Sequence, residues 1–477
     1  MSYPLFYYAA EIRVNYRFDF VSFMMIFLFL ERRIMAAKLS DHFGSKKLLL
    51  FVLPSVCMMV FTSIYIVVDG FFVSNYAGKT AFAAVNLIIP FTMILGAVGF
   101  MIGTGSTALV SKVMGEGDDK RANRIFSMMV YLTILFGVFF TAIGVALVPR
   151  VAVLLGATDE MLPDCVLYGR IIICFTTMFM LQNVFQSLFV AAEKPKLGLL
   201  ATVGAGVTNM VLDFLFVGVL GRGVAGAALA TGISQLVGGV LPLIYFALPN
   251  KSRLRLCPAR LEIKPILKVC ANGSSELMTN VSLSLVSMIY NAQLMKYIGE
   301  NGVSAYGVLM YAQMIFISIY IGYAVGSAPI ISYNYGAKNH AELKSMLKKS
   351  LAIISVTGVF LTALAFFLSG AVAKIFVGYD AELYELTVRA FKIFSCSFLL
   401  AGFNIFASAF FTALNNGAVS ALISFLRTLL FQSICVLVLP IVFGINGIWW
   451  AMTVAEIFAL IVSTGFIIGK RKKYHYM

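Results

Sequence analysis

Four acidic residues lie inside long apolar runs of the sequence: Asp69, Asp213, Glu276 and Glu456. A charged side chain at the centre of a membrane helix costs about 2.5–3.5 kcal/mol on insertion scales. Each carboxyl group therefore needs a partner, water or a proton, because burial disfavours its charged form. An acid that meets the two sides of a membrane in turn can take up and release a proton, which is the physical basis of proton coupling.

Two of these acids are predicted to meet in one cavity. Asn209 lies four residues before Asp213, on the same face of a predicted helix, and Asp69 comes from a helix in the same half of the chain. The alternative is structural: Asp69 caps a loop and Asp213 hydrogen-bonds an adjacent helix. Glu276 and Glu456 are candidates for a second acidic site, with solvation at a helix end as the alternative for Glu276.

A polar patch interrupts the fourth predicted helix. Three amides, Gln182, Asn183 and Gln186, lie there among methionine and phenylalanine residues that include Met178 and Phe185. A wall of this kind suits amphiphilic organic substrates, and methionine-rich surfaces adapt to many shapes. The alternative is that the amides hydrogen-bond between helices. Four basic residues at or within helix ends are expected to extend to an interface: Arg170, Arg389, Lys392 and Arg427.

The composition requires a membrane around these residues. Of the 477 residues, 61% are hydrophobic and only 12% are charged, whereas soluble proteins carry about 25% charged residues. This deficit of charged residues excludes soluble enzymes and nucleic-acid binders. The net charge of +15 does not indicate a nucleic-acid partner, because the basic residues lie between the apolar runs, as membrane topology requires. The seven cysteines are scattered without a CxxC motif, so we expect neither disulfides nor a metal site.

Twelve apolar runs are long enough to cross a bilayer, which takes about 20 residues. They lie near 48–74, 81–110, 125–148, 166–192, 197–220, 221–249, 266–299, 302–335, 351–377, 386–415, 417–443 and 445–469. The break between the fifth and sixth rests only on Gly221-Arg222-Gly223. Lys and Arg gather in one set of loops and in both terminal segments, which predicts that both termini face the cytoplasm.

The two halves of the sequence repeat one another at an offset of 221 or 222 residues. Ser111–Gly115 corresponds to Ser332–Gly336, and Gly223–Gly226 corresponds to Gly444–Gly447. Each repeat contains six helices, so both halves have the same orientation, as in alternating-access transporters built from parallel repeats. At this offset Asp69 and Asp213 face residues that do not ionise near neutral pH, which predicts coupling in the first half. GxxxG motifs at Gly99 and at Gly322 predict close helix packing.

We therefore expect an all-α polytopic membrane protein with two six-helix lobes. The predicted layout is an extension at 1–45, a first lobe at 46–250, a basic cytoplasmic linker at 251–265, a second lobe at 266–469 and a basic cytoplasmic tail at 470–477. Residues 1–34 fit neither a signal peptide nor a span. They indicate either a true start at Met35 or a helix that lies on the membrane.

Several motifs, in this order, resemble those of MATE multidrug and toxic compound exporters over residues 46–469. They are Ile64–Val73 with Asp69, Ala83–Asn86, Gly103–Ser106, Gly115–Gly117, Thr208–Asp213 and Gly223–Thr231. The resemblance implies a V-shaped pair of bundles in the inner cell membrane that exports organic cations or amphiphiles in exchange for H⁺ or Na⁺, without another cofactor. It assigns the cation site, including a possible Na⁺ site, to Asp69, Asn209 and Asp213, and Glu276 resembles the seventh-helix acid of other branches.

Two other classes of function compete with export. A flippase for lipid-linked oligosaccharides shares a related fold, but it generally needs a cationic cavity, and the interior charges here are mainly acidic. An intramembrane enzyme would need a catalytic pair or metal ligands, and the sequence has no HExxH, GxSxG or Walker motif and no histidine in a span. The predicted partners are small organic cations or amphiphiles and the lipid bilayer, with no nucleic acid, and the protein is expected to be monomeric.

Overall fold

The first half of the chain folds into long helices joined by short loops. The computed structural model describes residues 37–477, apart from the side chains at positions 77 and 79. The two hypotheses for residues 1–34 lie outside the described residues. The helices of this first bundle are α2 (Ser45–Phe72), the π-helix η1 (Val73–Ala77), α3 (Lys79–Gly115), α4 (Asp119–Leu154), α5 (Leu162–Cys174), α6 (Thr176–Ala191), α7 (Pro195–Asp213), the π-helix η2 (Phe214–Val219) and α8 (Gly223–Ala247).

The second half repeats this order of elements. Its helices, the second bundle, are α9 (Ile263–Tyr297), α10 (Glu300–Gly336), α11 (His340–Val377), α12 (Ala381–Ser395), α13 (Phe398–Ala413), α14 (Gly417–Phe425), the π-helix η3 (Leu426–Phe431), α15 (Gln432–Phe443) and α16 (Ile445–Tyr474). The predicted break around Gly221 is confirmed, because η2 ends at Val219 and α8 begins at Gly223.

Most of the predicted spans pass a test of length and apolar composition. Nine helices of residues 37–477 pass on their own, and two bent pairs raise the total to eleven. The pairs are α5 with α6, bent by 53°, and α12 with α13, bent by 48°. The other predicted span, near 266–299, corresponds to α9, which has 35 residues but many Ser, Asn and Thr among them. The helices are therefore consistent with twelve spans, one of which is unusually polar.

The internal repeat is visible in the backbone. Positive φ angles are uncommon for residues other than glycine, and in residues 37–477 they recur at corresponding positions 221 or 222 residues apart. These pairs are Gly78 and Gly299, Gly117 and Lys338, Glu193 and Asn415, and Gly223 and Gly444. Each pair lies at a junction between helices, so the two bundles turn the chain in the same way at the same places.

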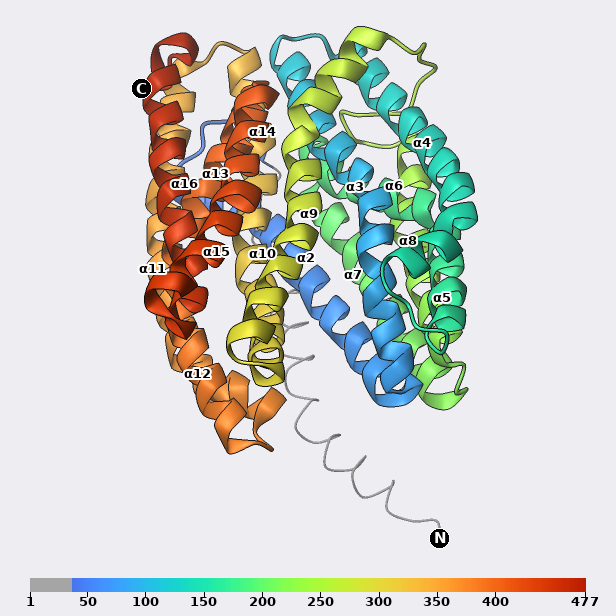
Figure 1. The fold of residues 1–477 in the computed structure, drawn as a ribbon. Coiled ribbons are helices and arrows are strands. Elements are labelled where there is room, and N and C mark those ends of the chain that lie inside the picture. Colours follow the sequence, from blue (N-terminus) through green and yellow to red (C-terminus); the bar gives the residue numbers. More distant parts are fainter. Residues whose placement is uncertain (1–36) are drawn as a thin grey trace. The chain divides into compact units, whose positions relative to one another are not determined.

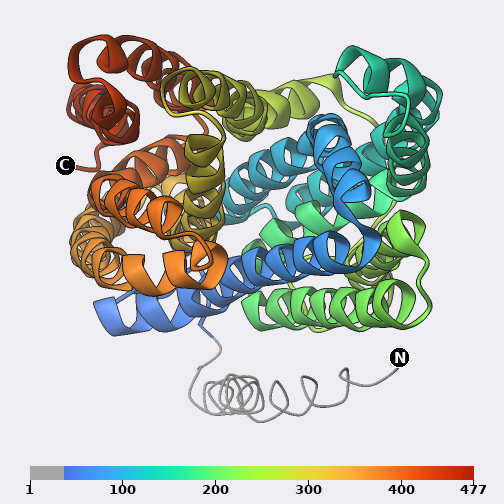
Figure 2. The same cartoon turned by 60° about the horizontal axis from the view of Figure 1, so that its bottom comes forward.

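Two symmetry-related helix pairs join the bundles. Within the unit formed by residues 39–477, α2 packs against α10 and α3 packs against α9 (Figures 1 and 2). Because α9 is the repeat counterpart of α2 and α10 that of α3, the two contacts are equivalent. The interface between the bundles is thus self-complementary, as expected for repeats related by a twofold axis.

Glycines allow this interface to close. A Cβ atom on Gly115 would overlap the carbonyl group of Tyr333, and one on Gly336 would overlap the carbonyl group of Lys112. These are the same contact seen from the two repeats, because both residue pairs are related by the 221-residue offset. The backbones of α3 and α10 therefore approach one another only because both positions lack a side chain.

The two GxxxG motifs serve close packing, as predicted, but on different partners. Gly99 packs against the backbone of Met180 on α6, within the first bundle. Gly322 packs against the backbone of Val56 on α2, across the interface between the bundles. The repeat therefore preserves the motif and not the helix that it contacts.

Candidate functional site

Asp69 and Asp213 come together inside the first bundle. Asp69 lies near the end of α2, and Asp213 is the last residue of α7. Their carboxyl groups interact with each other and with the Tyr168 hydroxyl of α5. Asp213 is fully buried, and among the described residues neither of its oxygens reaches hydrogen-bond geometry with any partner. Two carboxylates this close repel one another when both are ionised, so the pair is suited to holding a proton or a metal cation.

Asn209 and Thr231 complete this cluster. The Asn209 amide donates to Thr231 Oγ1 over 3.4 Å, and the Thr231 hydroxyl donates to Asp69 Oδ1 over 3.5 Å. Asn209 is one turn before Asp213 on α7, and Thr231 comes from α8. The structure therefore places Asp69, Asn209 and Asp213 in one cluster and adds Thr231, which the sequence analysis did not single out. Their role in cation coupling stays a prediction.

Each π-helical segment among the described residues lies beside an ionisable side chain in a span. η2 begins directly after Asp213, η1 begins four residues after Asp69, and η3 contains Arg427. A π-helical turn leaves some backbone groups without regular partners and is frequent at functional sites. The sequence offers no simple signal for these segments, because they replace only five or six residues within otherwise continuous apolar helices.

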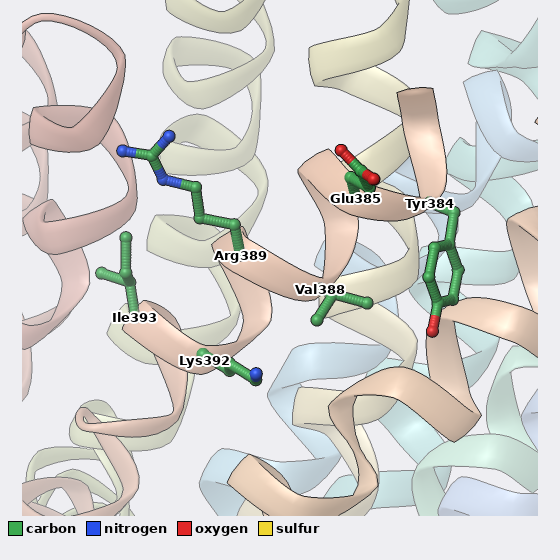
Figure 3. A pocket seen from close by; sticks show the side chains of 6 residues that line it. All are labelled: Tyr384, Glu385, Val388, Arg389, Lys392 and Ile393. Atoms are coloured by element: carbon green, nitrogen blue, oxygen red, sulfur yellow. The ribbon is translucent and has the colours of Figure 1, made fainter. Parts of the chain in front are cut away.

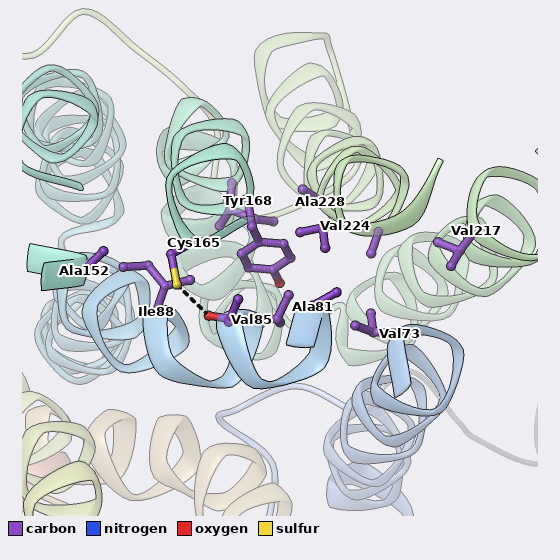
Figure 4. Packing of buried hydrophobic residues seen from close by; sticks show 13 residues of the cluster. Val73, Ala81, Val85, Ile88, Ala152, Cys165, Tyr168, Val217, Val224 and Ala228 are labelled. Carbon is purple, nitrogen blue, oxygen red and sulfur yellow. Dashed lines mark hydrogen bonds between the residues drawn. The ribbon is translucent and has the colours of Figure 1, made fainter. Parts of the chain in front are cut away.

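An apolar cluster covers one side of the acidic pair. Val73 and Val217, each four residues beyond an acid, belong to the same cluster as Tyr168, whose ring lies beside Val224 and Ala228 of α8 (Figure 4). The same cluster includes Cys165, whose thiol donates to the carbonyl of Ala84 over 3.4 Å.

The second bundle contains a buried ion pair that corrects one prediction. Arg427 was expected to extend to an interface, but its guanidinium binds Glu456 through Nε–Oε1, Nε–Oε2 and NH2–Oε1 contacts of 2.9, 3.0 and 2.7 Å. Asn404 donates to Glu456 Oε2 over 2.7 Å and to the Glu456 carbonyl over 3.0 Å. A buried charge without a partner is strongly destabilising, and Glu456 is fully buried. The Arg427 side chain therefore binds this acid inside the bundle and does not extend to an interface.

Glu276 lies on the polar helix α9 of the second bundle. Its side chain is half-buried, and Arg427 is the charged group that acts on it. Arg427 is already bound to Glu456. Two acids, Glu276 and Glu456, therefore share one arginine, and Glu276 has no cation of its own in this group. Glu276 is far along the sequence from Asp69 and Asp213 and belongs to the other bundle, so the structure divides the predicted acids between two sites.

The predicted substrate residues of α6 have different surroundings. Gln186 donates to Thr202 Oγ1 over 3.2 Å, and Asn183 donates to the carbonyl of Phe179 in its own helix over 2.8 Å. Phe185 is buried and stacks on Phe246, with ring centroids 5.6 Å apart. Gln186 therefore makes the hydrogen bond between helices that was the alternative considered, whereas Asn183 bonds within its own helix. Gln182 differs, because its side-chain oxygen is buried without a partner among the described residues.

The backbone of Met178 approaches α8. A Cβ atom on Gly239 would lie 2.8 Å from the Met178 carbonyl oxygen, so the glycine allows α6 and α8 to pack closely. The Met178 side chain is itself half-buried. Its role in substrate binding stays a prediction, as do those of the four neighbouring residues.

A surface pocket of about 460 Å³ lies away from both sites. All six of its lining residues belong to α12 (Figure 3). They include Glu385, Arg389 and Lys392, and the Lys392 ammonium lies 5.2 Å from the centre of the Phe366 ring. None of the predicted site residues lines this pocket. Within residues 37–477, no group of three or more His, Cys, Asp and Glu residues is arranged to hold a metal ion.

Further contacts tie the bundles together at the end that carries the α8–α9 loop and the C-terminus (Figure 1), which we call the basic end. The Leu39 N–H donates to Glu193 of the first bundle over 2.8 Å. Four residues later, the Phe43 N–H donates to Glu342 of the second bundle over 3.0 Å, and His42 Nδ1 lies 2.7 Å from the same carboxylate. Residues 39–43 therefore bridge the two bundles.

Comparison with known proteins bears on these sites directly. A family model described as MatE matches residues 54–215 and 277–437, one segment in each bundle, and together the segments cover more than half of the chain. The chain belongs to the MatE family. Membership confirms the resemblance seen in the sequence and places the chain among multi-pass membrane transporters. Asp69, Asn209 and Asp213 lie within the first MatE segment, and Arg427 lies within the second.

Named relatives and solved structures agree with this membership. The multidrug export protein MepA of Staphylococcus haemolyticus is 23% identical over 417 residues, covering 86% of this chain and 90% of the relative. MepA of Staphylococcus aureus strain NCTC 8325 is also 23% identical, with the same coverage. A multidrug resistance MATE transporter in its outward-facing conformation has a TM-score of 0.87 at 22% identity, covering 92% of this chain and 98% of that one. A transporter of the MOP superfamily from Pyrococcus furiosus has a TM-score of 0.83 at 23% identity, over 91% and 96% of the two chains. The two structures are similar to this chain in fold.

Proposed function

We propose that this MatE-family chain is a secondary active exporter that exchanges cationic or amphipathic organic compounds for H⁺ or Na⁺ by alternating access. The observation that supports this most is the Asp69–Asp213 pair. Both acids lie inside the first bundle, and Asp213 is fully buried with no hydrogen-bond partner among the described residues. A bound H⁺ or Na⁺ would neutralise the pair, and the entry of a positively charged compound would favour its release.

The asymmetry of the repeats supports the same assignment. Asp213 corresponds to Cys435 or Ile434 and Asp69 to Tyr290 or Asn291, so neither acid is required by the fold of a bundle. Asn209 donates to Thr231, and Thr231 donates to Asp69, so a chain of hydrogen bonds reaches one acid of the pair. In this proposal Glu276 supplies a second acidic group in the second bundle, which acts on the organic compound or on a second coupling cation.

The proposed setting is the inner membrane of a cell, with both termini in the cytoplasm. It follows from the lysine and arginine residues of the basic end, which include Arg253, Lys264 and the Lys470–Lys473 segment. The chain would act as a monomer, with the two lobes and basic linker predicted from the sequence. A lipid flippase fits less well, because the one buried guanidinium of the described spans, Arg427, is neutralised by Glu456 and is not available to a phosphate.

The proposal is tested in liposomes with the purified full-length chain. Ethidium movement would be followed under an imposed pH gradient and, separately, under an imposed Na⁺ gradient. We expect wild-type transport under one of the two gradients and loss of that transport in Asp213→Asn. Asp164→Asn, an acid in the first turn of α5, is the matched control and should transport normally. Gradient-driven transport that survives Asp213→Asn would assign coupling to Glu276 instead and contradict the proposal for the first bundle.

A further inference from the structure

One face of α12 is charged although this helix belongs to a membrane span. α12 and α13 together pass the test for a span as one bent pair. Ala390 and Phe394 are buried in the second bundle, whereas Glu385, Arg389 and Lys392 are exposed on the opposite side of the helix. A charged side chain at membrane depth is costly unless it is paired or reaches the headgroups of the lipids. This face, which we call the α12 face, therefore needs a polar partner.

No acid of the protein supplies that partner. Within residues 37–477, no ion pair joins Arg389 or Lys392 to a carboxylate, although Glu385 lies one turn before Arg389. The Lys392 ammonium lies instead 5.2 Å from the centre of the Phe366 ring on α11. The α12 face thus has two positive charges and one negative charge, which leaves one net positive charge.

The α12 face is also hollowed. It lines the pocket of about 460 Å³, in which the short side chain of Val388 lies between the longer ones of Tyr384 and Lys392 (Figure 3). A Cβ atom on Gly370 of α11 would lie 3.3 Å from the Tyr384 hydroxyl, so the pocket adjoins α11 at Gly370 as well as at Phe366. Its volume falls within the range of small-ligand sites.

The neighbouring helix α11 presents an apolar surface beside this pocket. Val356, Val359, Phe360 and Phe367 are all exposed, and their helical spacing places them on one face of α11. α11 begins at the basic end, and α12 lies at the opposite end of the unit formed by residues 39–477 (Figure 1). From the pocket, the exposed surface of α11 therefore runs toward the middle of the span, where the acyl chains of a bilayer lie.

The fold of a bundle does not require this pair of cations. At the 222-residue offset that holds along this part of the chain, Lys392 corresponds to Arg170 and Arg389 corresponds to Leu167 on α5. Both residues of α5 are exposed. The first bundle therefore has one cation at this place and an apolar side chain where the second bundle has another cation.

We propose that the α12 face binds an anionic phospholipid, with the phosphate held by Arg389 and Lys392 and an acyl chain along α11. Arginine offers several N–H donors to phosphate oxygens, and lysine offers a mobile ammonium group. A headgroup with one negative charge neutralises the net charge of the face, which a zwitterionic headgroup does not. The inference goes beyond the exporter proposal, because it requires only that α11 and α12 lie in a membrane. In the orientation proposed above, the lipid comes from the outer half of the bilayer.

Photo-crosslinking from the acyl-chain surface tests this inference locally. The photoreactive residue p-benzoylphenylalanine would replace Phe360 in the full-length chain, reconstituted in nanodiscs of equal parts phosphatidylglycerol and phosphatidylcholine with identical chains. We expect mass spectrometry of the crosslinked protein to show about fivefold more phosphatidylglycerol than phosphatidylcholine, the order expected for one net basic charge near a membrane surface.

The repeat provides a matched control position. Gly137-Val-Phe-Phe140 corresponds to Gly358-Val-Phe-Leu361 at an offset of 221, so Phe139 of α4 is the counterpart of Phe360. The two side chains are exposed to a similar degree, 54% and 62%. The same photoreactive residue at position 139 should capture the two lipids in nearly equal amounts.

Variants of the α12 face identify the groups that hold the lipid. Arg389→Gln and Lys392→Gln should each remove most of the enrichment at position 360, whereas Lys392→Arg should keep it. Glu385→Gln should raise the enrichment, because it removes the one negative charge of the face. Equal capture of the two lipids at position 360 would overturn the inference. Enrichment of the same size at position 139, or enrichment at position 360 that survives Arg389→Gln/Lys392→Gln, would overturn it as well.

Discussion

Arg427 and Glu456 form a bidentate ion pair inside the second bundle, with the shortest nitrogen–oxygen distance at 2.7 Å. The two residues are 29 positions apart and belong to different helices, η3 and α16. Arg427 also acts electrostatically on Glu276, but its guanidinium is already bound to Glu456, so Glu276 has no matched cation in this group of three side chains. The first bundle reaches an acidic interior by a different route, through two aspartates without a buried arginine.

Removing one partner of the ion pair should destabilise the protein more than removing both. Replacing one partner, as in Arg427→Met or Glu456→Gln, leaves the other buried and unmatched, and we expect a loss of about 3–5 kcal/mol in the free energy of unfolding. The double variant Arg427→Met/Glu456→Leu should recover most of this loss. Thermal unfolding of the purified variants checks this, and single and double variants that lose equal stability would contradict it.

The glycine contact between α3 and α10 should not tolerate a methyl group. Gly336→Ala places a Cβ atom on the carbonyl group of Lys112, and we expect a destabilisation of about 1–3 kcal/mol from overpacking. Gly307→Ala is the matched control on the same helix, because a Cβ atom there has no neighbour within 4 Å among the described residues. The control should be neutral or slightly stabilising. Equal melting temperatures for the two variants would show that the bundles do not meet at Gly336.

The bridge at the basic end should protect the backbone of Phe43. Glu342 accepts the Phe43 N–H and lies beside His42, so Glu342→Ala removes both contacts. We expect amide hydrogen exchange in peptides that cover residues 39–47 to become about tenfold faster, since a hydrogen bond to a charged group is lost. Glu385→Ala, an exposed acid on α12, is the control and should leave this exchange unchanged.

Thr231 should tune the acidic pair without being essential to it. Thr231→Val keeps the size of the side chain but removes the hydroxyl that links Asn209 to Asp69. We expect the H⁺ or Na⁺ concentration for half-maximal ethidium efflux to rise about fivefold, which corresponds to one hydrogen bond of about 1 kcal/mol. Thr231→Ser retains the hydroxyl and should restore the wild-type value. An unchanged half-maximal concentration in Thr231→Val would place Thr231 outside the coupling site.

The sequence predicted those features that depend on composition and spacing. Acids inside apolar runs identified Asp69 and Asp213, and the constant offset between the halves identified the repeat that relates α3 to α10. Arg427 was interpreted wrongly, because its pairing with Glu456 depends on how two distant helices are rotated toward each other. Opposite charges within the last two spans were the available signal for that pair. The π-helical segments were missed because a few residues of altered backbone leave the apolar pattern unchanged.

The site prediction was limited in the same way. The sequence placed Gln182, Asn183 and Gln186 in one patch because they are neighbours along α6. Gln182 and Gln186 are one turn apart and share a face of the helix, yet their surroundings differ. Gln186 meets Thr202 and Asn183 donates to a carbonyl of its own helix, while the Gln182 oxygen stays unpaired among the described residues. The residue types alone predicted that this region is polar. Which amide is hydrogen-bonded and which is left without a partner depends on how α6 packs against its neighbouring helices.

The most direct test of the account is proton or Na⁺ release when an organic cation binds. Purified wild type in weakly buffered detergent solution should release H⁺, followed with a pH-sensitive dye, or displace Na⁺ when ethidium is added. Asp213→Asn should bind ethidium with little or no release, because the group that holds the coupling cation is lost. Release from Asp213→Asn equal to that from the wild type would contradict coupling through the Asp69–Asp213 pair.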